Sequence, residues 1–329
     1  MRVLDDGAEE AYRHSRHWLD HPNHHLVSWQ APDYPPLLRR ISSPPLMLFV
    51  AGDPTVLWHP AIAVVGSRSP TAGGRDNAYH FAKALTESGL AIASGLAAGI
   101  DTEAHHGALA VPDGLTMAVL GTGPDIAYPR ANAGLLKQVA ERGAVLSEHP
   151  PGTDVRREHF PSRNRILAGL ALGTLVIEAT ERSGALITAR LAADAGREVF
   201  AVPGSIHNPM ARGCHRLIRD GAALVERADE VIAAALPVAA ELAAALRGRL
   251  HAPTSEPVRG TLPLALASVT DGPDYQRLWD ALGHDPTGMD QLAERTRLTA
   301  ANLSSMLLVM ELENRVSVEH GRYSRKSLG

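Results

Sequence analysis

Short apolar runs alternate with helix-length segments through the middle of the chain. The runs are AIAVVG (61–66), LAIASG (90–95), TMAVLG (116–121), AVLSEH (144–149), TLVIEA (174–179) and EVFAVPG (198–204). Because they lack the polar alternation of half-exposed strands, they predict strands that are buried on both faces. The segments 76–89, 132–143 and 184–196 between them have helical patterns. Residues 61–235 are therefore predicted to form an α/β domain, a Rossmann-like, doubly wound and mostly parallel sheet.

The flanking segments differ in composition from this middle part. Residues 1–60 are rich in His, Pro and Trp and are expected to form a partial N-terminal module or a lead-in to the sheet. Residues 236–264 contain the end of an alanine-rich helix and a stretch of linker composition. Residues 265–329 show three helical patterns followed by a short hairpin with Gly321 at its turn, which predicts a small C-terminal winged-helix domain.

Composition excludes few partners but limits where they can bind. The formal net charge of −4 gives no overall indication of nucleic-acid binding, so a polyanion would need a local basic patch. Cys214 is the only cysteine, which rules out an intramolecular disulfide. The first residues lack an apolar signal core, and no uninterrupted apolar stretch is long enough to cross a membrane. These features predict a cytoplasmic protein without membrane insertion.

Glycine-rich and polar loops follow the predicted strands, where ligands bind in a doubly wound sheet. GSR (66–68) follows the first strand and ERSGALITA (181–189) the fifth. We expect Gly66, Ser67, Arg68, Ser183 and Gly184 to meet at one edge, where backbone amides and a helix N-terminus favour an anion. Each loop alone is equally typical of a tight turn or a helix cap. GTG (121–123) lacks the third glycine of a dinucleotide site, and no Walker motif occurs, so no cofactor is predicted.

The segment DVRREHFPSRNR (154–165) adds positive charge to this edge. It contains four arginines, Arg156, Arg157, Arg163 and Arg165, against Asp154 and Glu158. We expect Ser162 or Asn164 to cap the helix that follows. Arginines near a helix N-terminus oppose the macrodipole at a cost of a few tenths to about 1 kcal/mol, so a bound anion would explain them. The alternative is that they pair with carboxylates of neighbouring loops.

A row of cations with an aromatic side chain is typical of a site for single-stranded nucleic acid. Arg130, in YPRAN after the GTG loop, would extend the row, and Phe160 offers a face on which a base can stack. No groove-reading element for double-stranded DNA is evident in this part of the sequence.

The sequence offers weak candidates for catalysis or metal binding. His105 and His106 follow Asp101 and Glu103, but a helix start with Asp101 as N-cap explains this cluster better than a metal site does. Glu178 ends a strand and is the best candidate for a general acid or base. A lone carboxylate is weak evidence for catalysis, so neither a catalytic nor a metal site is predicted.

The predicted winged helix is a poor candidate for reading DNA. Its expected recognition helix, TAANLSSMLLVMEL, contains no basic residue, whereas phosphate contacts dominate protein–DNA affinity. This argues against a transcription regulator and favours a regulatory or protein-contact role, with a structural appendage as the alternative.

Several motifs together resemble the DprA family, also called DNA-processing protein A or Smf. They are VVGSR, SGLAAGIDTEAHHGAL, YPRAN, SEHPPG, FPSRNRILAGLA, EATERSGALITARLAADAGREVFAVPGS and GCHRLIRDGA, in order over residues 61–225. The resemblance implies a non-enzymatic protein that binds and protects incoming single-stranded DNA and loads the RecA recombinase onto it in natural transformation. It also implies a homodimer formed through the Rossmann-like domain.

The resemblance also assigns residues to the nucleic-acid site. By motif, the phosphate-binding positions are Gly66, Ser67 and Arg68, basic residues are expected at Arg130 and Arg157, and FPSRNR contributes Phe160, Arg163, Asn164 and Arg165. The alternative from another class is a Rossmann-like nucleotide phosphoribohydrolase. ERSGALITA carries neither the PGG nor the glutamate of that signature, which disfavours the hydrolase.

Overall fold

The computed structural model describes residues 6–250, 273–282, 287–298, 315–319 and 322–325, with residues 303, 306, 307 and 310. The chain divides into two compact units, Met1–Pro253 and Thr254–Gly329. The expected linker, most of the expected recognition helix and Gly321 at the expected turn lie outside the described residues. Within the described part, no helix is long and apolar enough to cross a membrane.

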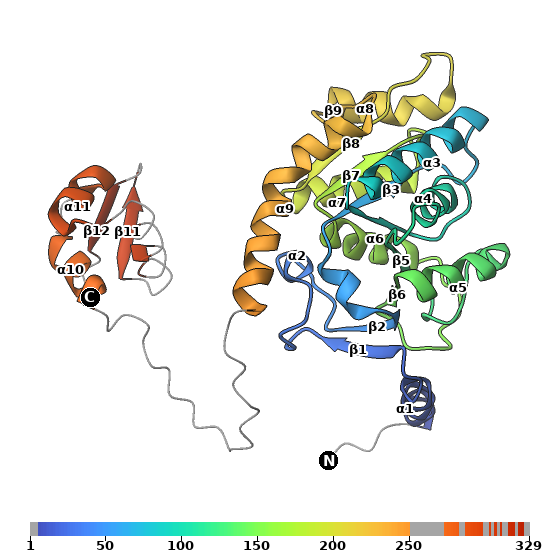
Figure 1. Ribbon diagram of the computed structural model, residues 1–329, viewed down its shortest axis with the longest axis horizontal. Coiled ribbons are helices and arrows are strands. Elements are labelled where there is room, and N and C mark those ends of the chain that lie inside the picture. Colours follow the sequence, from blue (N-terminus) through green and yellow to red (C-terminus); the bar gives the residue numbers. More distant parts are fainter. Residues whose placement is uncertain are drawn as a thin grey trace. The chain divides into compact units, whose positions relative to one another are not determined.

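The first unit is built on a nine-stranded sheet in the order β1-β2-β6-β5-β4-β3-β7-β8-β9 (Figure 1). The strands are β1 His24–Ser28, β2 Met47–Gly52, β3 Ala61–Val65, β4 Ala91–Ser94, β5 Thr116–Leu120, β6 Ala144–Ser147, β7 Gly173–Val176, β8 Glu198–Ala201 and β9 Ala223–Leu224. In this order, the strands from β6 through β5, β4, β3, β7 and β8 to β9 run parallel. At the other end, β2 pairs with β6 in antiparallel orientation, and β1 pairs with β2 in antiparallel orientation. The predicted α/β fold with a mostly parallel sheet is confirmed.

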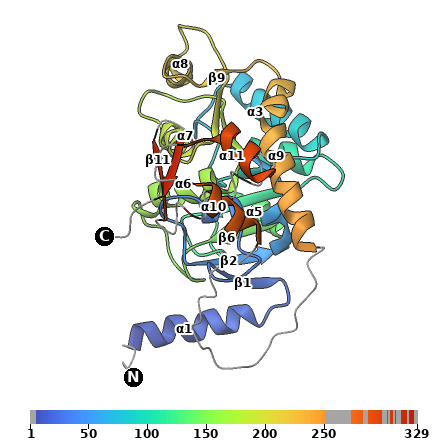
Figure 2. The same ribbon diagram turned by 90° about the vertical axis from the view of Figure 1, so that its left-hand side faces the viewer.

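The helices cover both faces of the parallel strands. Those of the first unit are α1 Asp6–Leu19, α2 Pro36–Arg39, α3 Ala72–Glu87, α4 Ile100–Leu109, α5 Ala133–Arg142, α6 His159–Leu170, α7 Gly184–Asp194, α8 Arg212–Arg219 and α9 Ala228–Leu250. Helices α2, α6, α7 and α8 pack on one face, and α3, α4 and α9 pack on the other. Helix α1 lies beyond β1, at the end of the sheet (Figure 2).

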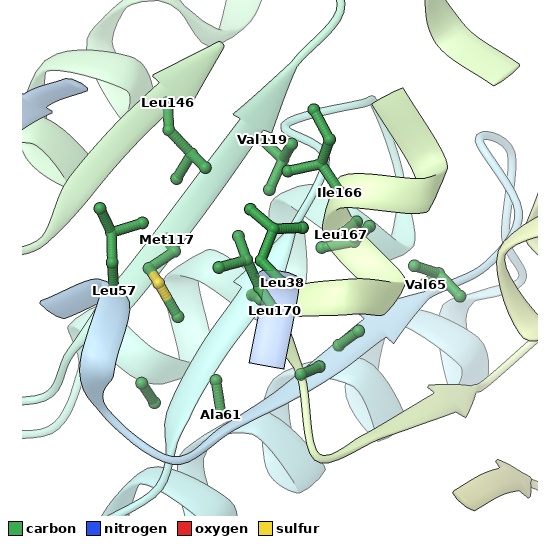
Figure 3. Packing of buried hydrophobic residues seen from close by; sticks show 14 of the residues in the cluster. Leu38, Leu57, Ala61, Val65, Met117, Val119, Leu146, Ile166, Leu167 and Leu170 are labelled. Atoms are coloured by element: carbon green, nitrogen blue, oxygen red, sulfur yellow. The ribbon is translucent and has the colours of Figure 1, made fainter. Parts of the chain in front are cut away.

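Strand β3 explains how one apolar run serves two cores. Its side chains alternate between the faces, as the period of two requires. Ala61, Ala63 and Val65 join the core beneath α6. Figure 3 shows Ala61 and Val65 in this core with Leu167 of α6. Ile62 and Val64 join the core beneath α3 and α4. The strand therefore contains no polar residue, and polar side chains occur only in the loop that follows it.

The single cysteine belongs to this core. Cys214 on α8 is fully buried, and its Sγ lies 3.5 Å from the carbonyl oxygen of Ile177. Burial raises the pKa of the thiol to about 12, so the sulfur remains protonated at neutral pH.

The second unit has the elements expected of a winged helix. It contains α10 Pro273–Ala281, α11 Met289–Thr296 and the short sheet β10-β12-β11, formed by Thr287–Gly288, Arg322–Arg325 and Val316–Glu319. Leu303, Met306, Leu307 and Met310 are buried at the spacing of one helix face. The Trp279 ring lies under the guanidinium groups of Arg315 and Arg325, at 4.5 and 4.6 Å.

We predict that the stability of the first unit depends on the packing of α6 against the sheet. Ile166 is fully buried between α6 and the strands. Ile166→Ala should lower the free energy of unfolding by roughly 2–5 kcal/mol, because it removes buried methyl groups and leaves a cavity. Denaturant unfolding measures this, with Ile206→Ala as the control because Ile206 is 74% exposed. Equal effects of the two changes would contradict the described packing.

Candidate nucleic-acid interface

A cleft of about 830 Å³ lies at the carboxyl ends of the parallel strands. The strand order reverses between β3 and β7, and the loops after these two strands diverge there. This is the place where open α/β sheets bind ligands. We call the hollow "the cleft"; its lining is Val65, Gly66, Ser67, Arg68, Ser69, Ala97, Asp101, Tyr128, Val155, Arg157, Phe160, Pro161, Arg163, Asn164, Leu167, Thr180, Ser183, Gly184, Ala185, Ile187 and Thr188.

The loop after β3 presents Arg68 from a fixed backbone. The Ser67 amide donates to the Glu178 carbonyl oxygen over 2.6 Å, and the Ile100 amide donates to the Ser67 carbonyl oxygen over 3.1 Å. Gly99 has φ +83°, and a Cβ there would overlap the Ser67 carbonyl oxygen, so only glycine allows this close approach. The Arg68 side chain is exposed, and its guanidinium carbon lies 5.4 Å from the centre of the Phe160 ring.

Helix α6 distributes the FPSRNR residues by helical phase. Besides Pro161 in its first turn, the side chains of α6 that line the cleft are spaced as i, i+3, i+4 and i+7, namely Phe160, Arg163, Asn164 and Leu167. Arg165 is two residues from Arg163, about 200° around the helix, and does not line the cleft. It instead forms a 2.5 Å ion pair with Glu148. For Arg165 the structure therefore shows the alternative, an ion pair with a neighbouring loop.

The prediction that Ser162 or Asn164 is the N-cap of α6 is wrong. Helix α6 begins at His159, before the phenylalanine, and Glu158 at the N-cap makes no side-chain cap bond. Ser162 and Asn164 therefore lie inside the helix, where the Ser162 hydroxyl donates to the His159 carbonyl oxygen over 3.0 Å. The Asn164 side chain is left facing the cleft.

Arg163 lies at the floor of the cleft and is only 5% exposed. Its guanidinium donates to the Val119 carbonyl oxygen at the end of β5. It also occupies the space that a side chain at Gly95 would take. Its Nε is buried without a hydrogen-bond partner among the described residues. Burial lowers the pKa of Arg163, and the nearby Asp101 carboxylate opposes that shift.

Asp101 is the buried counter-charge of Arg163. Its carboxylate accepts hydrogen bonds from the amides of Gly95 (3.1 Å) and Ala97 (3.3 Å). Burial raises the pKa of this carboxyl, and Arg163 opposes the rise. The expectation that Asp101 caps its helix is wrong, because Gly99 is the N-cap of α4 and Asp101 lies in the first turn. Asp101 instead bonds the loop after β4.

The N-terminus of α7 forms another wall of the cleft. Ser183 is its N-cap and accepts from the Ala185 amide over 3.3 Å, while Gly184 is exposed. The free amides and dipole of a helix start favour an anion. Ser183 and Gly184 therefore lie in the same cleft as Gly66, Ser67 and Arg68, as the sequence predicts.

The cations differ in their access to solvent. Arg157 lines the cleft and is exposed. Arg130 is exposed too but is not part of the lining. Among the residues that the structure describes, Arg68, Arg130 and Arg157 have no carboxylate within ion-pair distance. They are thus available for an external anion, unlike Arg163 and Arg165.

Tyr128 lines the cleft although the sequence did not single it out. The residue is 40% exposed, and the centre of its ring lies 5.3 Å from the centre of the Phe160 ring. Its signal was an aromatic side chain in YPRAN, two residues before Arg130. The GTG loop before it serves internal bonds: the Thr122 hydroxyl donates to Ile126, and the Gly123 amide donates to Thr153.

The candidates for acid–base or metal chemistry have structural partners. Glu178 is 7% exposed, and its carboxylate accepts from the Thr71 amide (2.8 Å), the Thr71 hydroxyl (2.7 Å) and the Asn208 side-chain amide (3.1 Å). His105 is fully buried, and its Nδ1 lies 2.7 Å from the Thr116 hydroxyl. Burial lowers the pKa of His105 to about 3, so its imidazole is neutral. Neither residue lines the cleft.

Comparison with known proteins places the chain in one family. Residues 25–236 match the family model of DNA recombination-mediator protein A, and residues 263–322 match that of the DprA winged helix domain. Protein Smf of Escherichia coli K12 is 38% identical over 309 residues, covering 94% of this chain and 79% of its own length. DNA processing protein DprA of Streptococcus pneumoniae R6 is 46% identical over 200 residues, covering 61% of this chain and 70% of its own.

Solved structures agree with the sequence comparison. The X-ray structure of DNA processing protein A from Streptococcus pneumoniae superimposes with a TM-score of 0.64 at 41% identity, covering 70% of this chain and 78% of that one. DNA processing protein A from Helicobacter pylori, solved to describe its single-stranded DNA binding mode, gives 0.58 at 26% identity, covering 64% and 96%. These matches confirm the family and the winged-helix domain that the sequence predicts. The chain belongs to the family of DNA recombination-mediator protein A.

Proposed function

We propose that this chain binds single-stranded DNA in the cleft and acts there as a recombination mediator. The observation that carries the proposal is the exposed Arg68, whose guanidinium lies over the Phe160 ring in the cleft that also contains the N-terminus of α7. Guanidinium groups and helix amides suit phosphates, and an aromatic face suits a base of any sequence. The Helicobacter relative, described for its single-stranded DNA binding, supports the same ligand for this chain.

Burial supports a division of roles among the site residues. Arg68 and Arg157 are exposed and would contact phosphates, together with the backbone of Gly66 and Ser67 and the helix start at Ser183 and Gly184. Phe160 would stack on a base, and the Asn164 amide would contact the bound nucleotide. Arg130 would meet a phosphate of the strand outside the cleft.

The buried arginines would contribute differently. Arg163 would hold the floor of the cleft, and Arg165 would fasten α6 through Glu148. Both would then act on the geometry of the site more than on its attraction for phosphate.

The wider role rests on family membership. The proposal includes loading of RecA onto the bound strand, protection of incoming DNA in natural transformation, a homodimer and a cytoplasmic site of action. It also includes the absence of catalysis, which the hydrogen bonds of the Glu178 carboxylate support, because this group is already committed to three donors.

Removing the charge of Arg68 should weaken binding and reduce its salt dependence. Arg68→Ala should raise the Kd for oligothymidine about tenfold or more, because a charge-assisted contact is lost. The slope of log K against log salt should become less steep by about 0.7, the value for one phosphate contact on a single strand. Fluorescence anisotropy over a range of salt concentrations measures both. Arg190→Ala is the control, since it removes one exposed charge outside the cleft; the same change of slope in both variants would contradict the assignment.

Arg163 should affect folding more than phosphate attraction. Arg163→Ala leaves Asp101 buried without its counter-charge and should lower the free energy of unfolding by roughly 3–5 kcal/mol. Denaturant unfolding tests this. Arg163→Lys keeps the charge but loses the planar guanidinium and should be intermediate. A folded, equally stable Arg163→Ala protein with a reduced salt slope would show that Arg163 contacts phosphate directly.

The winged-helix unit should contribute little to strand binding. Deleting 265–329 should leave the Kd for oligothymidine within about threefold, because the candidate phosphate contacts all lie in the first unit. A gel-shift assay compares the shortened and full chains. Complete loss of the shifted band would move the main binding surface to the second unit.

A further inference from the structure

Glu178 holds both ends of the loop that carries Arg68. At one end its backbone carbonyl oxygen accepts from the Ser67 amide over 2.6 Å. At the other end its carboxylate accepts from both the amide and the hydroxyl of Thr71, at 2.8 and 2.7 Å. Of the three intervening residues, Arg68 and Ser69 are exposed and Pro70 is half-buried, so packing alone does not determine the conformation of Arg68 and Ser69.

Further contacts orient the Glu178 carboxylate itself. The Asn208 side-chain Nδ2 donates to it over 3.1 Å, and the side-chain Oδ1 of Asn208 accepts from the Met210 amide over 2.9 Å. A Cβ at Gly74 would overlap the carboxylate, so α3 closes over it directly. The Thr71 hydroxyl also accepts from the Gly74 amide over 3.0 Å and so caps α3. The carboxylate thus joins the start of α3, the segment after β8 and the end of β7.

We propose that Glu178 is a positioning residue for nucleic-acid binding, acting through the loop of Ser67–Thr71. Held at both ends, this loop keeps Arg68 at the cleft beside Phe160 before any ligand arrives. The cost of ordering the loop then falls on folding and not on binding, which increases affinity. The inference rests on the proposed function, because it names a residue that supports the same cleft without touching the strand.

The direction in which Glu178→Gln changes the affinity for DNA distinguishes a positioning role of Glu178 from a purely electrostatic one. Glu178→Gln removes a negative charge near the cleft, so a purely electrostatic role predicts tighter binding of a polyanion. It also replaces one of the two acceptor oxygens with a donor, so the side chain can no longer accept at once from the Thr71 amide on one side and from the Thr71 hydroxyl and Asn208 amide on the other. Positioning therefore predicts weaker binding, by roughly two- to tenfold. The salt slope should be unchanged, because Arg68 and its charge remain.

The experiment measures oligothymidine affinity by fluorescence anisotropy in two backgrounds, wild type and Arg68→Ala, with thermal unfolding of every variant. Thr71→Ala serves as the second variant, because Thr71 is exposed and the change leaves the charge unaltered. Thr71→Ser, which keeps the hydroxyl, should restore most of the affinity. Asp53→Ala is the stability control: it removes the cap of a short 3-10 helix (Pro54–Trp58) outside the cleft.

If Glu178 acts through Arg68, then Glu178→Gln and Thr71→Ala weaken binding in the wild-type background and have no further effect in the Arg68→Ala background. Equal loss in both backgrounds, or a loss matched by Asp53→Ala, would overturn the inference and assign Glu178 to general stability. Tighter binding by Glu178→Gln would overturn it as well. If Glu178→Gln does not fold, the affinities of Thr71→Ala and Thr71→Ser, measured in the same two backgrounds, test the inference. Failure of the wild-type chain to bind oligothymidine would instead overturn the proposed function.

Discussion

Burial of the parallel strands on both faces is the constraint that organises this molecule. Apolar side chains of β3 enter two separate cores, so the strand has no face left for polar chemistry. Polar groups are confined to the loops at the strand ends. The reversal of strand order between β3 and β7 then separates two of those loops and leaves the cleft between them. The position of the site follows from the way the sheet is covered.

Within that frame, burial decides what each arginine can do. Arg68 of GSR and Arg163 and Arg165 of FPSRNR are all predicted to bind nucleic acid, but they occupy three different environments. Arg68 is exposed beside an aromatic ring, Arg163 is buried beside Asp101, and Arg165 is paired with Glu148. Two of the three charges are therefore compensated inside the protein. The affinity for a polyanion would depend on fewer groups than the arginine count of the sequence indicates.

The sequence predicts the sheet well because its strands are continuous apolar runs between turn residues, and all six predicted runs contain strands. It also predicts that the loops after β3 and β7 meet, because parallel topology brings their ends to one edge. It could not predict the partner of Arg165, because Glu148 follows a different strand, and that contact depends on the phase of α6. The start of α6 was misjudged for a related reason: a Ser or Asn cap is only a local preference, and packing of the helix on the sheet overrides it.

The bonds of Asp101 and Glu178 were beyond sequence analysis as well. Each carboxylate follows a strand and resembles a catalytic or capping group in isolation. The Glu178 carboxylate accepts from Thr71 and Asn208, which become its neighbours only after folding. The Asp101 carboxylate accepts from the Gly95 and Ala97 amides, which reach it only in the folded conformation of the loop before α4. The same is true of β2, whose antiparallel pairing with β6 depends on the edge that the parallel strands leave open, and of β1, which pairs with β2.

The burial of Cys214 has a practical consequence. Its thiol is shielded within the core and protonated at neutral pH, so maleimide reagents would find no reactive sulfur on the native surface. A cysteine introduced anywhere on the exterior would thus carry a fluorophore or spin label alone. Distances between a labelled protein and a labelled oligonucleotide could be followed in solution without first altering the native sulfur.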